Sequence, residues 1–413
     1  MQTLDRSIDD ALADPRTYGN MDEQHALFTQ LRAEDPVHWC APEGYRPFWV
    51  VSKHADVLEV ERQQDLFLNA PRSKLFPIAF EQEVKQLMAG RTHLVKGLPQ
   101  MDGNEHKLYR QLTQAWFQPK QVKQLEERIG ALAQRAVDEM LERGPELDFY
   151  NDVAAWFPLR VIMLILGLPA SDEERLLRIT QAYFGGSDPE VQRGSDLIHA
   201  AQDYRDYFDG VSEDRRRHPT DDVASIIANS SIDGQPIGHY EASSYYIALA
   251  SAGHDTTSST AAGGLLAMLQ QPGEWAKLKA NPALVPSAID EMVRWVSPVK
   301  HFFRTATQDY TLRGKNIREG DHLLMAYPSA NRDEEVFDAP FEFRVDRSPN
   351  RHVGFGYGAH ACLGMFLAKF ELQHLFRVLL ERVDSFELAG DPAWVQTSFV
   401  GGLKRLPVRV RPR

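Results

Sequence analysis

A single cysteine between a glycine-rich loop and an apolar helix pattern is the feature that most constrains this chain. The stretch 350–370 reads NRHVGFGYGAHACLGMFLAKF and contains Cys362, one of only two cysteines. Two cysteines are too few for a disulfide framework or a four-cysteine metal site. A free cysteine is most often a small buried apolar residue, which is our interpretation of Cys40. The residues around Cys362 must decide whether it has another role.

The loop before Cys362 favours a flat ligand held by a thiolate. Gly354, Gly356 and Gly358 permit backbone angles closed to other residues and close approach of a ligand to the main chain. We expect Cys362 to start the following helix, where the backbone amides lower a cysteine pKa. One thiolate is a poor zinc site but a suitable axial ligand for haem iron, because the porphyrin supplies four nitrogens. A dinucleotide-phosphate loop is the alternative, but the full glycine fingerprint and a βαβ setting are missing.

Composition indicates an ordinary water-soluble protein of the reducing cytoplasm. The 413 residues are 43% hydrophobic and 25% charged, and the net charge of −12 argues against general affinity for nucleic acid. The start, MQTLDRSIDDALADPRTYG, lacks the regions of a secretory signal, and the apolar run at 161–168 is too short to span a bilayer. Without a linker or repeat, we expect one domain over residues 1–413, with no membrane association.

Helical periodicity dominates the sequence, and small sheets are expected beside the helices. Apolar residues recur at three and four positions in four long segments: 121–144, 239–271, 286–296 and 362–383. Strand-like alternation around turn residues occurs in three shorter segments: 45–54, 301–331 and 405–412. These patterns predict a mainly α fold with small β-sheets.

A second group of residues lies in the segment 239–271. Ala248, Ala252 and Thr256 recur every four residues and make a low stripe on one helix face, against which a flat macrocycle fits. Asp255 and Thr256 place an acid and a hydroxyl in an apolar helix, where the threonine can bond back to a carbonyl and bend the helix. Taken alone, the stripe is also consistent with a small-residue helix contact that leaves the aspartate exposed.

A third group is the pair Glu291 and Arg294, three residues apart and therefore neighbours on a helix. Alone, such a pair is usually an exposed ion pair worth below about 1 kcal/mol.

Together these motifs resemble the cytochrome P-450 family of haem-thiolate monooxygenases, in the soluble bacterial form. FGYGAHACLG matches the family's haem loop, AGHDTT its oxygen-binding helix and EMVR its Glu-x-x-Arg helix, in the expected order. The resemblance runs from about residue 20 to the end. It implies the cytochrome P-450 fold, a single mostly helical domain with a smaller β-rich region, and haem b between the Asp255 and Cys362 helices.

The resemblance also implies roles for individual residues. Cys362 is the proximal iron ligand, and Asp255 with Thr256 guides proton delivery during dioxygen activation. Glu291, Arg294 and Arg347 form a buried structural triad beneath the haem loop. The contacts to the haem propionates fall on His106, Arg110, Arg304 and His360; taken singly, each is also consistent with a solvated surface residue. Phe302 departs from the pattern, because some members carry an aspartate there that lies near a propionate.

We expect a two-iron ferredoxin and its NAD(P)H-dependent reductase to supply the electrons. We also expect the enzyme to be a monomer. Lys107, Arg351 and Lys369 are candidates for a basic docking patch, although solvated surface charges are the plainer interpretation. A haem sensor or electron carrier is the alternative of a different class, but neither needs Asp255 with Thr256.

The substrate is expected to be a compact hydrophobic molecule, a monoterpenoid or an alkyl-substituted ring. The runs YYIALASAGHDTTSS, RWVSPVKHFFRTA and SANRDEEVF look like those of bacterial α-terpineol hydroxylases, and fatty-acid, aromatic-acid or steroid hydroxylation is the alternative. Ala248 and Ala252 leave room above the iron, while Val299 and Phe399 are predicted apolar walls. We expect the stem of Lys300 to pack and its charge to reach solvent; facing the pocket, it would favour an acid substrate.

Overall fold

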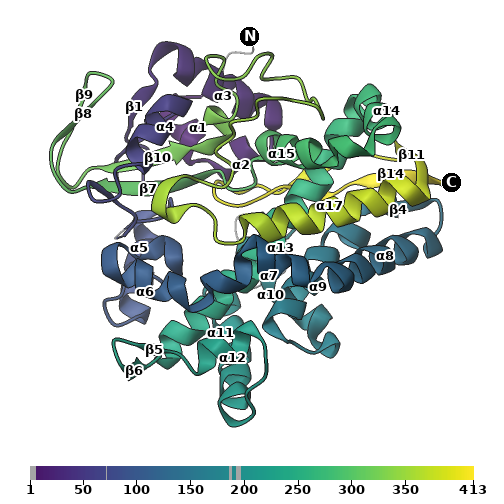
Figure 1. Cartoon of the computed structure of the whole chain (residues 1–413). Helices are drawn as coiled ribbons and strands as arrows, with labels where there is room; N and C mark the ends of the chain where they lie inside the picture. Colours follow the sequence, from purple (N-terminus) through teal and green to yellow (C-terminus); the bar gives the residue numbers. More distant parts are fainter. Residues whose placement is uncertain (1–5, 71, 186–187, 192–196) are drawn as a thin grey trace.

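Helices make up most of the chain in the computed structural model, which describes residues 6–70, 72–185, 188–191 and 197–413 (Figure 1). The α-helices are α1 Ile8–Ala13, α2 Pro15–Tyr18, α3 Met21–Glu34, α4 His54–Glu61, α5 Ile78–Leu87, α6 Gly103–Thr113, α7 Pro119–Gln124, α8 Glu126–Glu142, α9 Phe157–Leu166, α10 Glu173–Phe184, α11 Leu197–Arg217, α12 Val223–Ala228, α13 His239–Gln270, α14 Pro272–Ala280, α15 Val285–Val296, α16 Tyr327–Ala330 and α17 Met365–Arg382.

The main sheet has five strands in the order β1-β2-β10-β7-β3. Its strands are β1 Val37–Cys40, β2 Phe48–Val51, β3 Phe67–Leu68, β7 His301–Ala306 and β10 His322–Ala326. β10 pairs parallel to β2 and antiparallel to β7, so segments distant in the sequence meet in one sheet. Cys40 is fully buried in the core on this sheet, as its interpretation as a small apolar residue requires.

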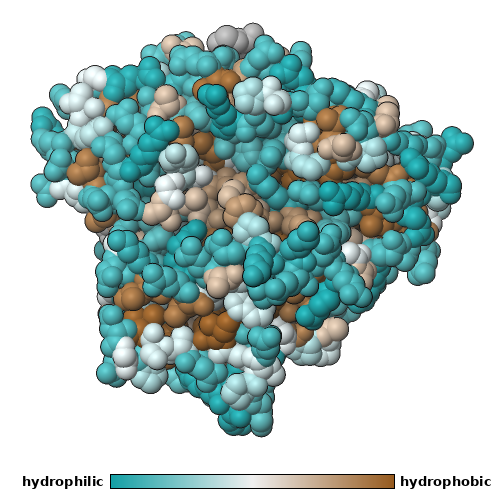
Figure 2. All heavy atoms as spheres, viewed as in Figure 1, coloured by the Kyte–Doolittle hydropathy of each residue, from teal (hydrophilic) through white to brown (hydrophobic). Residues whose placement is uncertain are grey.

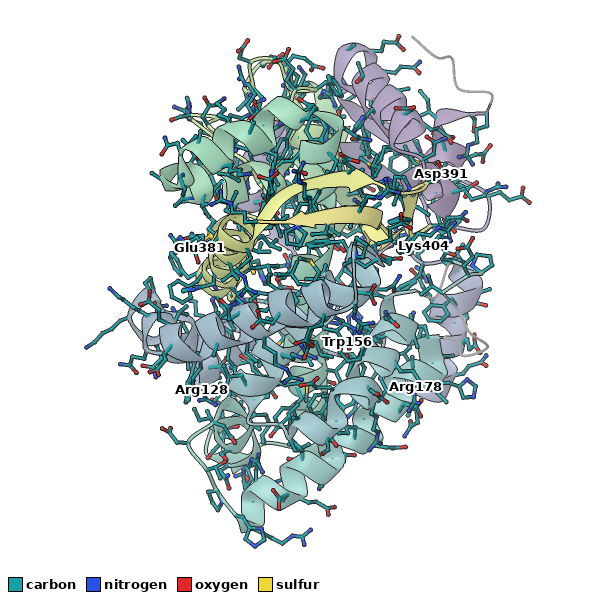
Figure 3. All side chains as sticks on the ribbon, turned by 90° about the vertical axis from the view of Figure 1, so that its right-hand side faces the viewer. Arg128, Trp156, Arg178, Glu381, Asp391 and Lys404 are labelled. Carbon is teal, nitrogen blue, oxygen red and sulfur yellow. The ribbon has the colours of Figure 1, made fainter. Side chains whose placement is uncertain are left out.

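Smaller sheets lie at the C-terminal side and in hairpins. The C-terminal sheet has the order β11-β14-β4. The bounds of the remaining strands are β4 Glu146–Asp148, β5 Ser231–Ile232, β6 Gln235–Pro236, β8 Tyr310–Leu312, β9 Lys315–Ile317, β11 Val383–Leu388, β12 Ala393–Trp394, β13 Leu403–Arg405 and β14 Pro407–Pro412. Figure 3 shows the C-terminal strands beside Glu381 of α17, with Arg128 of α8 below them.

The 32-residue helix α13 runs through the interior of the helical part. It packs against α9, α11, α15 and α17, and buried residues occur on nearly all of its faces, as expected for a helix without a polar side. At 1.5 Å per residue it is about 48 Å long. This length carries residues of α13 across the molecule and past the loop that precedes α17.

The predicted segments match the elements, with shifted ends. The predicted helix 121–144 divides at Leu125 into α7 and α8, and 362–383 begins as a helix only at Met365. The segment 301–331 holds four strands and the short helix α16. None of the helices in the described ranges combines the length and apolar character needed to cross a bilayer. The face in Figure 2 is mostly hydrophilic, with hydrophobic side chains over its middle and lower left.

Candidate haem and substrate site

A cavity between α13 and the loop before α17 gathers residues from distant parts of the chain. Its walls come from α6, α13, β7 and the loop 354–364, with further side chains from α4 and α17. The lining residues that the sequence singled out are His106, Arg110, Ala248, Ala252, Thr256, Val299, Arg304, His360 and Cys362.

The loop before α17 presents Cys362 to this cavity. The Cys362 amide donates to the Phe355 carbonyl at 2.8 Å, which closes the loop. Gly358 has φ +70°, and a Cβ there would lie 2.6 Å from the Glu61 carbonyl oxygen, so only glycine fits. The expectation that Cys362 starts the helix was wrong by three residues. α17 begins at Met365, because Cys362 to Gly364 form the turn that leads into it.

The environment of the Cys362 thiol also differs from the expectation of a lowered pKa. Cys362 is solvent-exposed where it lines the cavity, although the surrounding protein desolvates the sulfur. Burial raises the pKa of Cys362, and the Gly364 and Met365 amides and the Arg110 charge only partly offset this effect. The protein alone therefore does not hold Cys362 as a thiolate; a bound cation such as iron would supply the missing charge.

The nitrogen donors predicted to bind propionates line the same cavity as Cys362. The Arg110 guanidinium donates to the Ala361 carbonyl at 2.8 Å. The rings of His106 and His360 lie 4.1 Å apart between centroids. His106 is buried, yet its Nε2 finds no hydrogen-bond partner within the described part of the chain. Because a buried polar atom without a partner is costly, this unsatisfied nitrogen and the basic groups beside it fit an anionic group such as a propionate.

Glu61 is a member of the site that the sequence reasoning missed. Its Oε1 accepts hydrogen bonds from Arg304 at 2.7 Å and from the Tyr327 hydroxyl at 2.6 Å. Its Oε2 is buried and has no partner among the described residues. Burial raises the pKa of Glu61, while the charge of Arg304 opposes the shift. The sequence could have indicated this residue, because Glu61 follows Val57 by four positions and therefore lies on the same buried face of α4.

Asp255 and Thr256 lie on different faces of α13. The Thr256 hydroxyl lines the cavity and donates to the Ala252 carbonyl at 2.7 Å, the back-bond expected from the sequence. α13 nevertheless continues as one helix past this point. Asp255 is buried outside the cavity lining, and burial raises its pKa to about 7. Its charge also raises the pKa values of Tyr150 and Tyr204, so these phenols lie nearby.

Glu291, Arg294 and Arg347 come together in the interior beside the cavity. The Glu291 carboxylate accepts from Arg294 at 2.7 and 2.8 Å and from the Arg347 Nε at 3.0 Å. Arg294 also donates to the Asn331 carbonyl, and the Asn331 side chain accepts from the Val353 amide at 2.7 Å. Glu291 and Arg294 are fully buried rather than an exposed pair. Through Asn331 this network holds the start of the Cys362 loop.

Phe399 and Lys300 both differ from the expectations drawn from the sequence. Phe399 is absent from the described cavity lining; its ring packs edge-on against Phe302, which lines the cavity, at 5.3 Å between centroids. The expectation that the Lys300 charge reaches solvent was wrong. Lys300 is 2% exposed, and its Nζ donates to the carbonyls of Val296 and Ser297 at 3.2 and 3.0 Å. It does not line the described cavity, because the ammonium turns back to the end of α15.

Comparison with known proteins places this site in context. The family model described as Cytochrome P450 matches residues 191–392. Cytochrome P450-terp of Pseudomonas sp is 43% identical over 407 residues, covering 96% of this chain and 95% of that protein. Linalool 8-monooxygenase of Pseudomonas putida is 33% identical over 390 residues, covering 94% and 96%. The crystal structure of CYP108D1 from Novosphingobium aromaticivorans gives a TM-score of 0.91 at 43% identity, covering 98% of each chain.

These likenesses confirm the predicted family, its mainly α fold with small sheets and the monooxygenase class, and set aside the haem-sensor and electron-carrier alternative. The chain belongs to the cytochrome P450 family of monooxygenases, whose members bind haem and use dioxygen and redox partners.

Proposed function

We propose that this P450 hydroxylates a compact hydrophobic substrate, a monoterpenoid or an alkyl-substituted ring. One observation carries the proposal: Ala248 and Ala252 of α13 line the same cavity as Cys362, with Val299 and Phe302 as further apolar walls. Small side chains leave room near the metal ligand, and apolar walls favour a hydrocarbon over water. The name of the relative linalool 8-monooxygenase supports a terpenoid.

The structure does not favour fatty acids or aromatic acids as substrates, because the lysine that would have paired with their carboxylate does not line the described cavity. Lys300 bonds to backbone carbonyls at the end of α15 and does not reach the described cavity. The basic groups that do line it, His106, Arg110, Arg304 and His360, are the proposed propionate partners. A steroid remains the bulkier neutral alternative.

We assign haem b to the cavity, held by this chain's own residues. When bound, the haem supplies the dioxygen-activating chemistry. Cys362 would hold the iron, and His106, Arg110, Arg304 and His360 would bind the propionates. Asp255, with its pKa of about 7, holds or releases a proton near neutral pH. The Thr256 hydroxyl faces the substrate side, where it can donate a hydrogen bond after leaving the Ala252 carbonyl.

Electrons are proposed to come from a two-iron ferredoxin with its NAD(P)H-dependent reductase, docking at basic residues. Lys107 and Arg351 are exposed, whereas Lys369 is paired with Asp290 at 2.6 Å and is the weaker contributor. Lys107→Glu and Arg351→Glu should slow haem reduction without changing substrate affinity. The matched control is Arg178→Glu on α10, an exposed site labelled in Figure 3. Equal slowing by all three would contradict the patch.

The substrate proposal is tested by haem spin-shift titration of the ferric protein. The panel holds monoterpenes, alkylbenzenes, steroids, fatty acids and aromatic acids, and product analysis with ferredoxin and reductase follows. Compact neutral ligands should shift the spin state and yield alcohols, and hydrogen peroxide alone should not replace the electron supply. A response to acids or steroids only would reject the terpenoid assignment. The monomeric state, the cytoplasmic location and the single domain stay predictions.

A further inference from the structure

A second cavity lies outside the haem cavity, between α5, β10, the segment before β2 and the segments on either side of α5. Its lining includes Arg46, Arg72, Lys74, Glu81, Lys85 and His322. Its volume is about 120 Å³, well below the roughly 300 Å³ at which drug-sized sites begin. In Figure 1, α5 lies directly below the main sheet, which carries β10. The size indicates a small ligand.

The charges around this cavity do not balance. Arg46, Arg72, Lys74 and Lys85 face a single carboxylate in the described lining, that of Glu81. Glu81 is already engaged, because its Oε2 accepts from the Arg46 Nε at 2.6 Å. Its Oε1 forms an ion pair with the Arg72 Nε at 3.7 Å, too long for a hydrogen bond. The cavity therefore holds an excess of positive charge.

Arg72 is a buried cation with weak hydrogen-bond acceptors, although its guanidinium lies over the Phe303 ring at 4.4 Å from the centroid. It is 6% exposed, and its Nε has no hydrogen-bond partner within the described ranges. Its two terminal nitrogens reach only the Arg46 carbonyl, each at a long 3.4 Å. Burial lowers the pKa of Arg72 to about 10, so it stays charged at neutral pH. A buried guanidinium this poorly satisfied is costly unless an anion completes its hydrogen bonds.

Lys74 adds a second, partly buried cation, and the electrostatic effect of the cations is visible at two nearby histidines. The Lys74 ammonium has an aromatic contact, with its Nζ 4.4 Å from the Phe399 ring centroid, and burial lowers its pKa to about 8. Burial first, and then the charges of neighbouring cations, hold the pKa values of His93 and His322 at about 4. At neutral pH these histidines are uncharged, so each ring can offer one N–H donor without adding to the repulsion among the cations.

We propose that this cavity binds the carboxylate of a small organic acid, with its hydrocarbon part against Phe76. The guanidinium of Arg72 offers a planar fork of donors that matches a carboxylate, and Lys74 adds a second cation. Phe76, whose ring is tilted against that of Phe80 at 4.8 Å between centroids, gives an apolar wall that an inorganic oxyanion does not use. The inference does not depend on the proposed substrate, because the Phe399–Phe302 pair stands between Lys74 and the haem cavity.

The test is calorimetric titration of the haem-loaded protein with butanoate and benzoate, while the Soret band reports on the haem cavity. We expect millimolar binding without a spin shift. Arg72→Gln should weaken it roughly tenfold or more, because a charged hydrogen bond is lost. Lys74→Met provides a second variant with the same expected direction, in case Arg72→Gln fails to fold. The band near 450 nm of the reduced carbon monoxide complex checks folding.

The matched control is Arg91→Gln, which removes one positive charge from an exposed arginine outside the lining. It should leave the dissociation constant within about twofold, as expected for a screened surface charge. Inorganic phosphate and neutral benzyl alcohol should bind more weakly than benzoate. Four results would overturn the site: no carboxylate binding, equal loss in Arg91→Gln and Arg72→Gln, phosphate binding as tight as benzoate, or a Soret shift that follows the titration.

Discussion

Arg304 donates to the Glu61 carboxylate at 2.7 Å inside the haem cavity, although 243 positions separate the two residues. A cation proposed for a propionate therefore already has an acidic partner from this chain. Glu61 stands at the end of α4 and Arg304 in β7, so the contact joins the main sheet to the cofactor site.

We predict that Glu61→Gln raises the haem reduction potential. Removing a negative charge near the haem favours the reduced form, because reduction adds negative charge to the site. A spectroelectrochemical titration should show a positive shift, and Tyr327 can still donate to the amide oxygen. The control is Glu59→Gln, the same charge change at an exposed position of α4. Equal potentials in Glu61→Gln and the parent would mean that Glu61 is protonated or distant from the haem.

Asp255→Asn is predicted to stabilise the folded protein increasingly as pH rises. Burial raises the pKa of Asp255 from 3.8 to about 7, so the folded state resists the charged form. The parent protein therefore loses folding stability as pH rises through this interval, and the loss reaches about 4 kcal/mol at neutral pH. The variant has no carboxyl at this position and does not lose this stability. Denaturant unfolding of variant and parent at about pH 5.5 and 8 should show the gap widening. A constant gap would contradict the raised pKa.

Local chemistry made part of this site predictable from the sequence. The glycine loop, Cys362 and the Ala248 stripe lie in continuous segments, so local motifs carried the family resemblance that implied their roles. The Glu61–Arg304 contact and the position of Phe399 depend on how distant strands and helices pack, which spacing does not encode. Lys300 shows most clearly that residue spacing does not predict where a flexible side chain points. Its neighbour Val299 lines the cavity, while the flexible lysine stem turns its ammonium back to the α15 carbonyls.

Breaking the buried triad should cost far more than breaking a surface pair. Glu291→Gln leaves Arg294 and Arg347 without their shared carboxylate in the interior, with an expected loss of 3–5 kcal/mol, roughly the range for buried pairs. Haem content after expression should fall as well, because Asn331 ties this network to the Cys362 loop. Arg135→Ala, which breaks the exposed pair with Glu139, should cost below about 1 kcal/mol. Similar losses would show that the triad is not structural.

Ala248→Phe is predicted to abolish spin shifts by compact neutral ligands while the haem spectrum persists. The Ala248 side chain borders both the cavity and the loop at Gly97, where a Cβ would come within 2.7 Å of the Ala248 Cβ, so a larger residue has only the cavity to fill. Phe399→Leu is the matched contrast, because Phe399 lies behind Phe302. It should change dissociation constants by less than about tenfold, the lower end of the range for an altered hydrophobic contact in a pocket. A stronger effect at Phe399 would place the substrate elsewhere.

Lys300→Met is predicted to stabilise the protein and leave ligand selection unchanged. Burial lowers the pKa of Lys300 from 10.5 to about 7, so the folded state is penalised as pH falls through this interval, by about 4 kcal/mol near pH 7. Losing the bonds to Val296 and Ser297 offsets roughly half of that gain. Lys404→Met should instead destabilise the folded protein. It removes the ammonium that donates to the buried Asp188 carboxylate at 2.9 Å, so that this carboxylate loses its partner. At neutral pH the melting temperature should rise in Lys300→Met and fall in Lys404→Met. Spin-shift titrations of Lys300→Met should match those of the parent for terpenes and acids alike. Loss of an acid-induced shift in Lys300→Met would instead place this lysine at the substrate.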